Sequence, residues 1–338
     1  MKIKPSKLKP GDTIGIVAPS AGVYKDAKHR IDRAILFLEK LGFKVKLGKS
    51  VFVDDLSEYV SGAIEERVSD MHYFFSDKDV KMIVCAIGGN HSNQLLSELD
   101  YDLIRNNPKI FLGYSDMMVL HYALYTQSDL ITYYGPCAAT QMGEFPDVFE
   151  YTKKHFVNTF IDVDFNPHKL IPSEKWTDEF LDWFKQEDLE RPRVFKKNNG
   201  YRWIVPGKAS GKLLPACIYA INHTLGTKYW VDPSDKILFL DLLFTQGELT
   251  ESSTTSFLYD LYNADVFKKI KGLVISRPFN YTEESKENIY KLINTLIIKS
   301  EVKYPVVAEV DFGHTDPMLT LEYDKEVFLD SSADNITF

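Results

Sequence analysis

Apolar runs that alternate with helix-patterned segments constrain the fold of this chain more than any other feature. Residues 82–87 are uninterruptedly apolar and end at Gly88-Gly89, while apolar side chains in residues 31–41 recur at helical spacing up to Gly42. This alternation is typical of a parallel sheet covered on both faces. We therefore predict an α/β fold, with an N-terminal, mostly parallel sheet that has helices on both faces and a smaller mixed α/β C-terminal domain. Further apolar runs predict the strands of that smaller domain: residues 237–243, 273–276, 306–310 and 326–329.

The pattern changes in a stretch rich in charge, aromatic residues and proline. We predict an N-terminal domain over residues 1–165, a connector over 166–205 and a C-terminal domain over 206–338. Four aromatic residues of the connector fall near one face of a helix, if the segment is helical: Trp176, Phe180, Trp183 and Phe184. Such a face either packs the connector onto a domain or forms an aromatic wall over a site.

Composition excludes several classes of function. The 338 residues carry a net charge of −8 and show no basic stripe with interleaved aromatics, which argues against nucleic-acid binding. No apolar run approaches the length of a membrane span. The cysteines are odd in number and far apart, which indicates reduced thiols and a cytoplasmic protein rather than disulfides or a metal site: Cys85, Cys137 and Cys217.

Ser115 is the candidate nucleophile. A strand-like run ends at Gly113 and a helix-like run begins just after Ser115, so the serine lies on a sharp turn from strand to helix. Such a turn exposes the hydroxyl and presents the free backbone N–H groups of the helix to developing negative charge. The second glycine of the usual nucleophile elbow is missing here, and a serine before aspartate can also serve simply as a helix cap.

A hydroxyl nucleophile needs a base, and eight histidines are available. His314 lies in a loop bounded by glycine and proline, directly after a predicted strand. Catalytic side chains concentrate in loops of this kind. We favour His314 as the base, and His91 and His223 stay open as alternatives.

Several motifs in order resemble the LD-carboxypeptidase family of serine peptidases, and within it the branch of microcin C immunity (MccF-like) peptidases. They are residues 87–93 (Ile-Gly-Gly-Asn-His-Ser-Asn), 107–116 (Asn-Pro-Lys-Ile-Phe-Leu-Gly-Tyr-Ser-Asp), 134–136 (Tyr-Gly-Pro) and 313–317 (Gly-His-Thr-Asp-Pro). The resemblance implies a Ser-Glu-His triad with the nucleophile in the N-terminal domain and the acid and histidine in the C-terminal domain. It also implies a homodimer that hydrolyses small peptides, muropeptides or peptidyl-nucleotide conjugates without a metal or organic cofactor.

On this pattern Ser115 attacks the amide carbonyl, and His314 takes its proton and later protonates the leaving amine. The oxyanion would be held by backbone N–H groups of Asp116 and of a loop glycine, either Gly88 or Gly89. The candidate substrate-binding residues are Asn90, Ser92, Tyr134 and Trp176.

Three departures from the family pattern bear on the site. Asp241 stands where the family has glutamate, Pro215-Ala216-Cys217 replaces Gly-Gly-Asn, and Glu322-Tyr323-Asp324 replaces Pro-Ile-Gly. Aspartate can orient a triad histidine, although its side chain is one methylene shorter, and a strand-end acid without a catalytic role is the alternative. The resemblance implies that residues 215–217 lie in a loop beside the site, so we expect a remodelled pocket there. The alternatives to a peptidase are a binding protein of the same fold with weakened catalysis, and an esterase or acyltransferase that uses the same triad.

Overall fold

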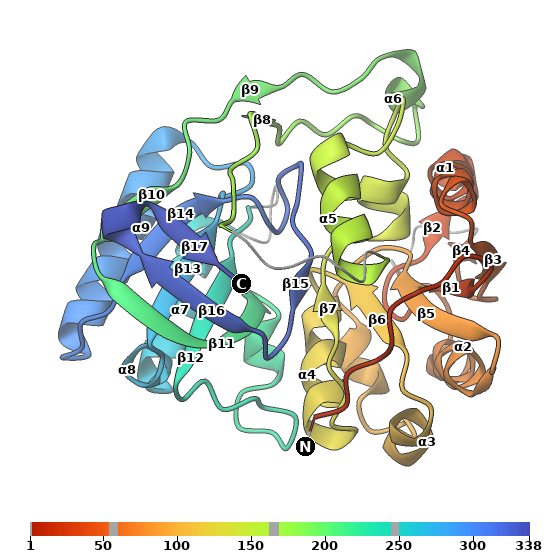
Figure 1. Cartoon of the computed structure of the whole chain (residues 1–338), viewed down its shortest axis with the longest axis horizontal. Coiled ribbons are helices and arrows are strands. Elements are labelled where there is room, and N and C mark those ends of the chain that lie inside the picture. The colour runs from red at the N-terminus through yellow and green to blue at the C-terminus, as the bar shows by residue number, and fades with distance from the viewer. Residues whose placement is uncertain (1, 54–59, 162–168, 245–249) are drawn as a thin grey trace. The chain divides into compact units, whose positions relative to one another are not determined.

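The computed structural model describes residues 2–53, 60–161, 169–244 and 250–338, and the chain divides into two compact units (Figure 1). The first unit comprises Met1–Phe165 and Glu179–Val194, and the second comprises Asn166–Asp178 and Phe195–Phe338. The boundary expected between residues 165 and 166 lies outside the described residues. The connector expected over 166–205 is shared between the two units, because its central part packs with the first.

The first unit is built on a parallel sheet with the strand order β7-β6-β5-β1-β3. Its central strands β1, β5 and β6 are buried, because helices cover both of their faces. The strands of this unit are β1 Thr13–Val17, β2 Val23–Tyr24, β3 Lys44–Leu47, β4 Phe52–Val53, β5 Val80–Cys85, β6 Ile110–Gly113 and β7 Tyr133–Tyr134, and the short β2 and β4 pair separately.

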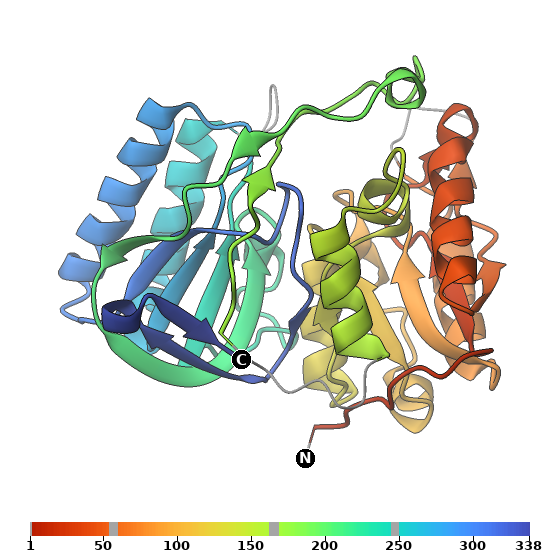
Figure 2. The same cartoon turned by 45° about the horizontal axis from the view of Figure 1, so that its top comes forward.

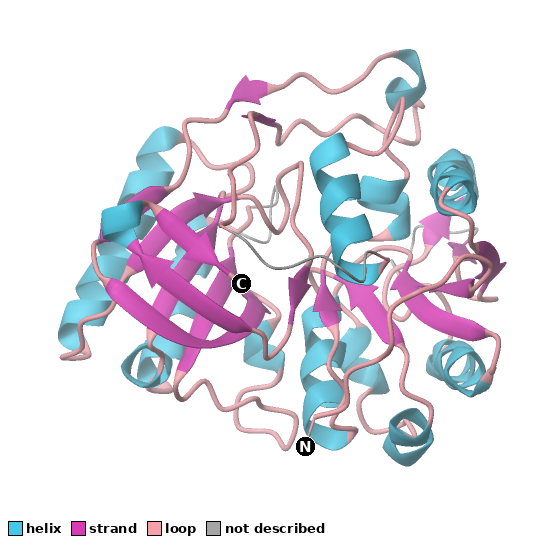
Figure 3. Cartoon of the chain, viewed as in Figure 1, coloured by secondary structure: helices cyan, strands magenta, loops and turns pink. Residues whose placement is uncertain are grey.

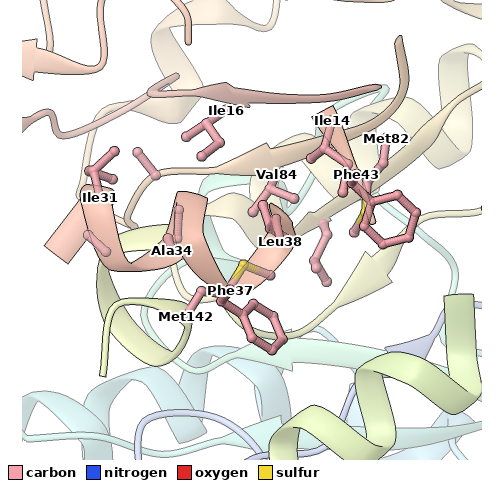
Figure 4. Close-up of a cluster of buried hydrophobic side chains, with 14 of the residues drawn as sticks. Ile14, Ile16, Ile31, Ala34, Phe37, Leu38, Phe43, Met82, Val84 and Met142 are labelled. Atoms are coloured by element: carbon pink, nitrogen blue, oxygen red, sulfur yellow. The ribbon is translucent and has the colours of Figure 1, made fainter. Parts of the chain in front are cut away.

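Alternate residues of each strand pack against different helices. On one face, Ile14 and Val84 join a core with Leu38 of α1 and Phe156 of α5 (Figure 4). On the other face, the ring of Phe74 in α2 lies against Gly15, where an added Cβ would be only 2.3 Å away from a ring carbon. The helices of this unit are α1 Lys28–Lys40, α2 Ile64–Ser76, α3 Tyr101–Asn106, α4 Met117–Gln127, α5 Glu150–Phe160 and α6 Glu187–Glu190, with short turns at Lys25–Ala27, Ser92–Leu95 and Ala138–Met142.

Buried charge holds residues 179–194 on the first unit. The carboxylate of Asp188 in α6 lies 2.9 Å from His29 Nε2, 3.0 Å from Arg30 Nη1 and 3.1 Å from Arg33 Nη1, all on α1. The ring of Trp183 lies 4.5 Å from the Arg30 guanidinium carbon. These contacts explain why a segment distant in sequence belongs to this unit.

The second unit contains a mixed sheet with the strand order β10-β14-β13-β12-β11-β16-β17. Figure 3 draws its strands, like all strands of the chain, in magenta. Its central strands β11, β12, β13 and β14 run parallel, and β10, β16 and β17 pair with them or with each other in antiparallel fashion. The strands are β8 Lys175–Trp176, β9 Lys196–Lys197, β10 Arg202–Val205, β11 Lys208–Cys217, β12 Lys236–Asp241, β13 Gly272–Ser276, β14 Val306–Val310, β15 Leu321–Glu322, β16 Glu326–Asp330 and β17 Asn335–Thr337.

The longer helices of the second unit, α7 Glu251–Asn263 and α9 Glu283–Lys299, lie side by side (Figure 2). The short helix α8, Val266–Lys269, precedes β13, and short turns occur at Ile221–His223 and Ser331–Ala333. In the part of the chain that the structure describes, no helix is long and apolar enough to cross a membrane.

The expected fold class is confirmed: a parallel N-terminal sheet covered on both faces and a mixed C-terminal sheet. The expected helical face of the connector is wrong. Trp176 lies in β8, which pairs with β9, and Phe180 follows outside any helix or strand with 62% of its surface exposed. Long-range pairing of Trp176 with Lys196 overrides the local helical spacing of the aromatic residues.

Candidate active site

Ser115 occupies the turn between strand β6 and helix α4. Its φ of 66° lies in the left-handed region, which a residue with a Cβ seldom adopts. Such strained positions cluster at functional sites. The turn therefore has the backbone geometry of a nucleophile elbow, although the usual second glycine is missing.

Gly88 lies directly against this serine. A Cβ added to Gly88 would approach Ser115 Cβ to 3.0 Å and Oγ to 3.1 Å. The neighbouring Gly89 has a φ of 142°, a conformation that also favours glycine. Residues 88–92, called the glycine loop below, are thus neighbours of Ser115 within one unit. An oxyanion hole built from the loop and the turn requires this arrangement.

The carboxylate of Asp116 organises the glycine loop. Its Oδ2 accepts hydrogen bonds from Ser20 Oγ at 2.6 Å, from the Ser92 N–H at 2.9 Å and from the His91 N–H at 3.1 Å. The Ser92 hydroxyl donates in turn to the Asp116 carbonyl at 2.9 Å. We predicted only a backbone role for Asp116, and the sequence signal for its side chain is an acid next to the serine at a buried turn.

Two aromatic side chains of the first unit support the turn. The Ser115 N–H donates to the hydroxyl of the buried Tyr134 at 3.1 Å. His121 Nε2 lies 2.9 Å from the Gly113 carbonyl and donates to it. Burial lowers the pKa of His121 to about 4, so this histidine is neutral at pH 7 and serves as a hydrogen-bond donor.

Asp241 and His314 form a pair in the second unit. His314 Nδ1 lies 2.8 Å from Asp241 Oδ2, and the Ser276 hydroxyl donates to Asp241 Oδ1 at 3.1 Å. Asp241 is fully buried at the end of β12. Gly313, at a φ of 86°, permits this approach, because a Cβ there would lie 2.0 Å from Asp241 Oδ1. Sequence reasoning missed the roles of Ser276 and Gly313.

The loop that carries His314 is anchored on both sides. Thr177 and Asp316 exchange backbone hydrogen bonds of 2.7 and 2.9 Å. At the end of β14, the buried Asp311 accepts from the Ser173 N–H at 2.8 Å and from Arg277 Nη1 at 2.6 Å. Desolvation raises the pKa of Asp311 and the Arg277 guanidinium opposes the rise. The loop is therefore held in place before and after the histidine.

Residues 215–217, expected in a loop, form the end of strand β11. They pair with Phe239, Leu240 and Asp241 of β12. Pro215 is tolerated in a central strand because the pairing with β16 ends at Lys212, so that no partner there requires its missing N–H. This register places Cys217 beside Asp241.

The other candidate substrate-binding residues differ from one another in exposure and in the unit to which they belong. Asn90 is exposed and Ser92 is buried. The ring of Trp176 is half-buried in the second unit, 4.6 Å from Lys196 Nζ and 4.9 Å from the Arg277 guanidinium carbon. Ser115 lies in the first unit and the Asp241–His314 pair in the second, so their assembly into one triad belongs to the proposal below.

Comparison with known families identifies the class to which this fold and these motifs belong. The LD-carboxypeptidase N-terminal domain matches residues 14–135, and the LD-carboxypeptidase C-terminal domain matches residues 210–329. The chain belongs to the LD-carboxypeptidase family of serine peptidases.

The individual relatives include an MccF immunity protein and a protein named as a carboxypeptidase of murein peptides. The microcin C7 self-immunity protein MccF of Escherichia coli is 30% identical over 332 residues, covering 98% of this chain and 94% of that protein. A Bacillus subtilis protein named probable murein peptide carboxypeptidase is 34% identical over 242 residues, covering 71% of this chain and 65% of that protein.

Solved structures share the fold over nearly the whole chain. An MccF-like protein from Bacillus anthracis has a TM-score of 0.88 at 33% identity, covering 99% of this chain and 98% of that one. MccF in complex with aspartyl sulfamoyl adenosine has a TM-score of 0.89 at 29% identity, with the same coverage.

Proposed function

We propose that this protein is a serine peptidase that hydrolyses an amide bond in a small peptide, a muropeptide or a peptidyl-nucleotide conjugate. Its triad is Ser115, His314 and Asp241. The observation that carries the proposal is the left-handed backbone of Ser115 at a strand-to-helix turn, in contact with Gly88. The buried acid–histidine pair of the second unit supplies the other two members.

The reaction follows from the chemistry of these groups. Ser115 Oγ attacks the amide carbonyl while His314 Nε2 takes its proton. The Nδ1–H of His314 donates to Asp241, which fixes the tautomer and stabilises the imidazolium that forms. Collapse of the tetrahedral intermediate breaks the C–N bond, and His314 returns the proton to the leaving amine. A water then hydrolyses the acyl-enzyme by the same route.

The oxyanion is held by backbone N–H groups. The Asp116 N–H lies at the start of α4, and Gly88 or Gly89 supplies the second donor. The hydrogen bonds from Ser20, His91 and Ser92 to the Asp116 carboxylate hold the loop that contains these glycines. An oxyanion hole must be preorganised in this way to lower the barrier of the chemical step.

The distance between Asp241 and His314 favours an enzyme over a binding protein with weakened catalysis. A shorter acid that failed to reach the histidine would have supported the binding protein, and the two groups lie at hydrogen-bond distance. The change from glutamate to aspartate is accommodated within the second unit, with Ser276 as a further donor to the acid.

Relatives suggest two substrate classes for the test. One solved relative binds aspartyl sulfamoyl adenosine, and another relative is named a murein peptide carboxypeptidase. The protein is incubated separately with aspartyl sulfamoyl adenosine and with an LD-linked murein tetrapeptide, and products are followed by liquid chromatography with mass spectrometry. We expect one of them to be cleaved at its amide bond by the native protein and not by Ser115→Ala.

The matched control is Ser128→Ala at the far end of α4. The Ser128 hydroxyl is buried and donates to the Tyr101 carbonyl at 3.0 Å, far along the helix from the turn. Cleavage by Ser115→Ala at the rate of the Ser128→Ala control would contradict the proposal. The homodimer and the cytoplasmic location stay predictions, and light scattering coupled to size-exclusion chromatography tests the former.

A further inference from the structure

Three chemically different side chains converge beyond the carboxyl ends of the parallel strands in the second unit. They are Cys217 at the end of β11, Asp241 at the end of β12 and His314 in the loop after β14. The thiol sulfur, a carboxylate oxygen and a ring nitrogen all lie within 4.8 Å of one another. Cys217 and Asp241 are also direct partners in the β11–β12 register, so the strand pairing itself fixes their separation.

Thiolate, imidazole and carboxylate together form a ligand set for zinc and related metals of intermediate or high softness. In a tetrahedral zinc site the ligand atoms lie about 3.3 to 3.6 Å apart. To reach that spacing, the more distant ligand atoms approach by at most about 1.5 Å, while His314 Nδ1 and Asp241 Oδ2 separate from 2.8 Å by about 0.5 to 0.8 Å. His314 is the member able to move, because it lies in a loop and 14% of its side chain is exposed, while Asp241 is fully buried.

We propose that Cys217, Asp241 and His314 form an inhibitory binding site for Zn²⁺ and for the softer Cd²⁺. The metal binds the thiolate, the carboxylate and the imidazole, and the Cys217 proton is released to solvent. The fourth position is left to water. Catalysis does not need this metal, since the hydrolysis proposed above uses only water and the side chains and backbone of the chain.

Inhibition follows from the two ligands that the site shares with the proposed triad. A metal between His314 and Asp241 replaces the 2.8 Å hydrogen bond that holds the imidazole, so the ring can no longer act as a base for Ser115. This part of the inference rests on the proposed function. The coordination itself does not, because it requires only the second unit.

Metal binding is measured first, without reference to activity. Chelator-treated protein is titrated with Co²⁺, which replaces Zn²⁺ in such sites and gives a thiolate-to-metal absorption band in the near ultraviolet. We expect a band that saturates at one Co²⁺ per chain and disappears when Zn²⁺ is added. The band should be absent in Cys217→Ala and Cys217→Ser, whose folding is checked by thermal unfolding.

Cys137→Ala is the matched control. Cys137 is as buried as Cys217, but it lies in the first unit and outside the group formed by Cys217, Asp241 and His314. We expect this variant to keep the Co²⁺ band. A native protein without a thiolate band, or a band retained in both folded Cys217 variants, would overturn the proposed site.

Inhibition is measured second, each variant being compared with its own metal-free rate. We expect Zn²⁺ to inhibit the native protein and Cys137→Ala, and the inhibitory concentration to rise at least ~10-fold in Cys217→Ala. Equal inhibition of Cys217→Ala and the native protein would overturn the inhibitory role. If the native protein has no hydrolytic activity, the proposed function fails while the Co²⁺ band still decides the metal site.

Discussion

His314 Nδ1 lies 2.8 Å from Asp241 Oδ2, a distance at which the buried carboxylate accepts a hydrogen bond from the Nδ1–H and fixes the ring tautomer. The approach depends on the residue before the histidine, since a side chain at Gly313 would overlap Asp241. The Asp241 side chain therefore packs against the histidine loop on one side and accepts a hydrogen bond from the Ser276 hydroxyl on the other.

Asp241→Asn is expected to reduce kcat on the order of 10⁴-fold, because the asparagine amide stabilises the wrong tautomer of His314. Asp241→Glu is expected to be impaired as well, on the order of 10²-fold, because the extra methylene displaces the carboxylate by about 1 Å in the space beside Gly313. Steady-state kinetics on the substrate found for the native protein measures both. A more active Asp241→Glu would show that aspartate is the inferior acid at this position.

Gly88→Ala is expected to abolish hydrolysis while the protein still folds. The added methyl would lie 3.0 Å from Ser115 Cβ and 3.1 Å from Oγ, where the substrate carbonyl must approach. We expect kcat/KM to fall at least ~100-fold, with a loss of about 1–3 kcal/mol in the free energy of unfolding from the overpacking.

Gly207→Ala is the control for this glycine. The nearest atom to a Cβ at Gly207 is 3.5 Å away, an ordinary contact. Urea unfolding and kcat/KM are measured on both variants. Activity in Gly88→Ala equal to that of Gly207→Ala would place the substrate away from this loop.

Asp116→Asn is expected to loosen the glycine loop. Three donors share Asp116 Oδ2. Replacing this charged carboxylate oxygen by a neutral amide weakens each hydrogen bond by about 1 kcal/mol, or about 3 kcal/mol in all. Ser20→Ala removes one of these donors and also the oxygen that accepts from the His91 N–H at 2.9 Å, and it should cost about 1–2 kcal/mol. Chemical denaturation gives both values, and hydrogen exchange at the His91 and Ser92 amides reports the loop directly. Unchanged exchange in Asp116→Asn would refute the organising role.

The stability of the protein is expected to fall as the pH decreases from about 6.5 to about 4. His121 is neutral when folded because burial lowers its pKa to about 4, whereas in the unfolded chain it titrates near 6.5. The unfolded state therefore binds more protons in this window, so stability rises with pH there. The contribution of His121 amounts to about 3 kcal/mol between the two limits.

Urea unfolding at pH 7, 5.5 and 4 measures this effect. His121→Gln should reduce the dependence without abolishing it, because burial also lowers the pKa of His155 to about 4. The exposed His223→Gln should leave the dependence as in the native protein. The same slope in His121→Gln and the native protein would assign the acid sensitivity to other groups.

Local patterns predicted the strands and the fold class because burial on both faces demands uninterrupted apolar residues, as in Leu273, Val274 and Ile275 of β13. They could not predict contacts between distant residues. Asp188 meets α1 across more than 150 positions, and Trp176 pairs with Lys196 instead of continuing a helix. The family resemblance suggested a loop at residues 215–217, yet the parallel pairing with β12 continues through them.

The same distinction applies to the candidate site. The sequence context predicted a strand-to-helix turn at Ser115 and a histidine in a strand-end loop. The left-handed backbone of Ser115 and the bond of Asp116 to Ser20, 96 residues away, arise only from packing of the first unit. The acid was found through the family resemblance, since a buried aspartate at the end of a strand carries no signal of its own.

The most direct measurement of the central claim is covalent labelling of the native protein with a fluorophosphonate, followed by peptide mapping. An activated serine attacks the probe, so we expect one label per chain on Ser115, little label in His314→Ala and none at this position in Ser115→Ala. Labelling of Ser128→Ala should equal that of the native protein. A native protein that hydrolyses peptides yet carries its label on another residue, or keeps its activity in Ser115→Ala, would contradict the account.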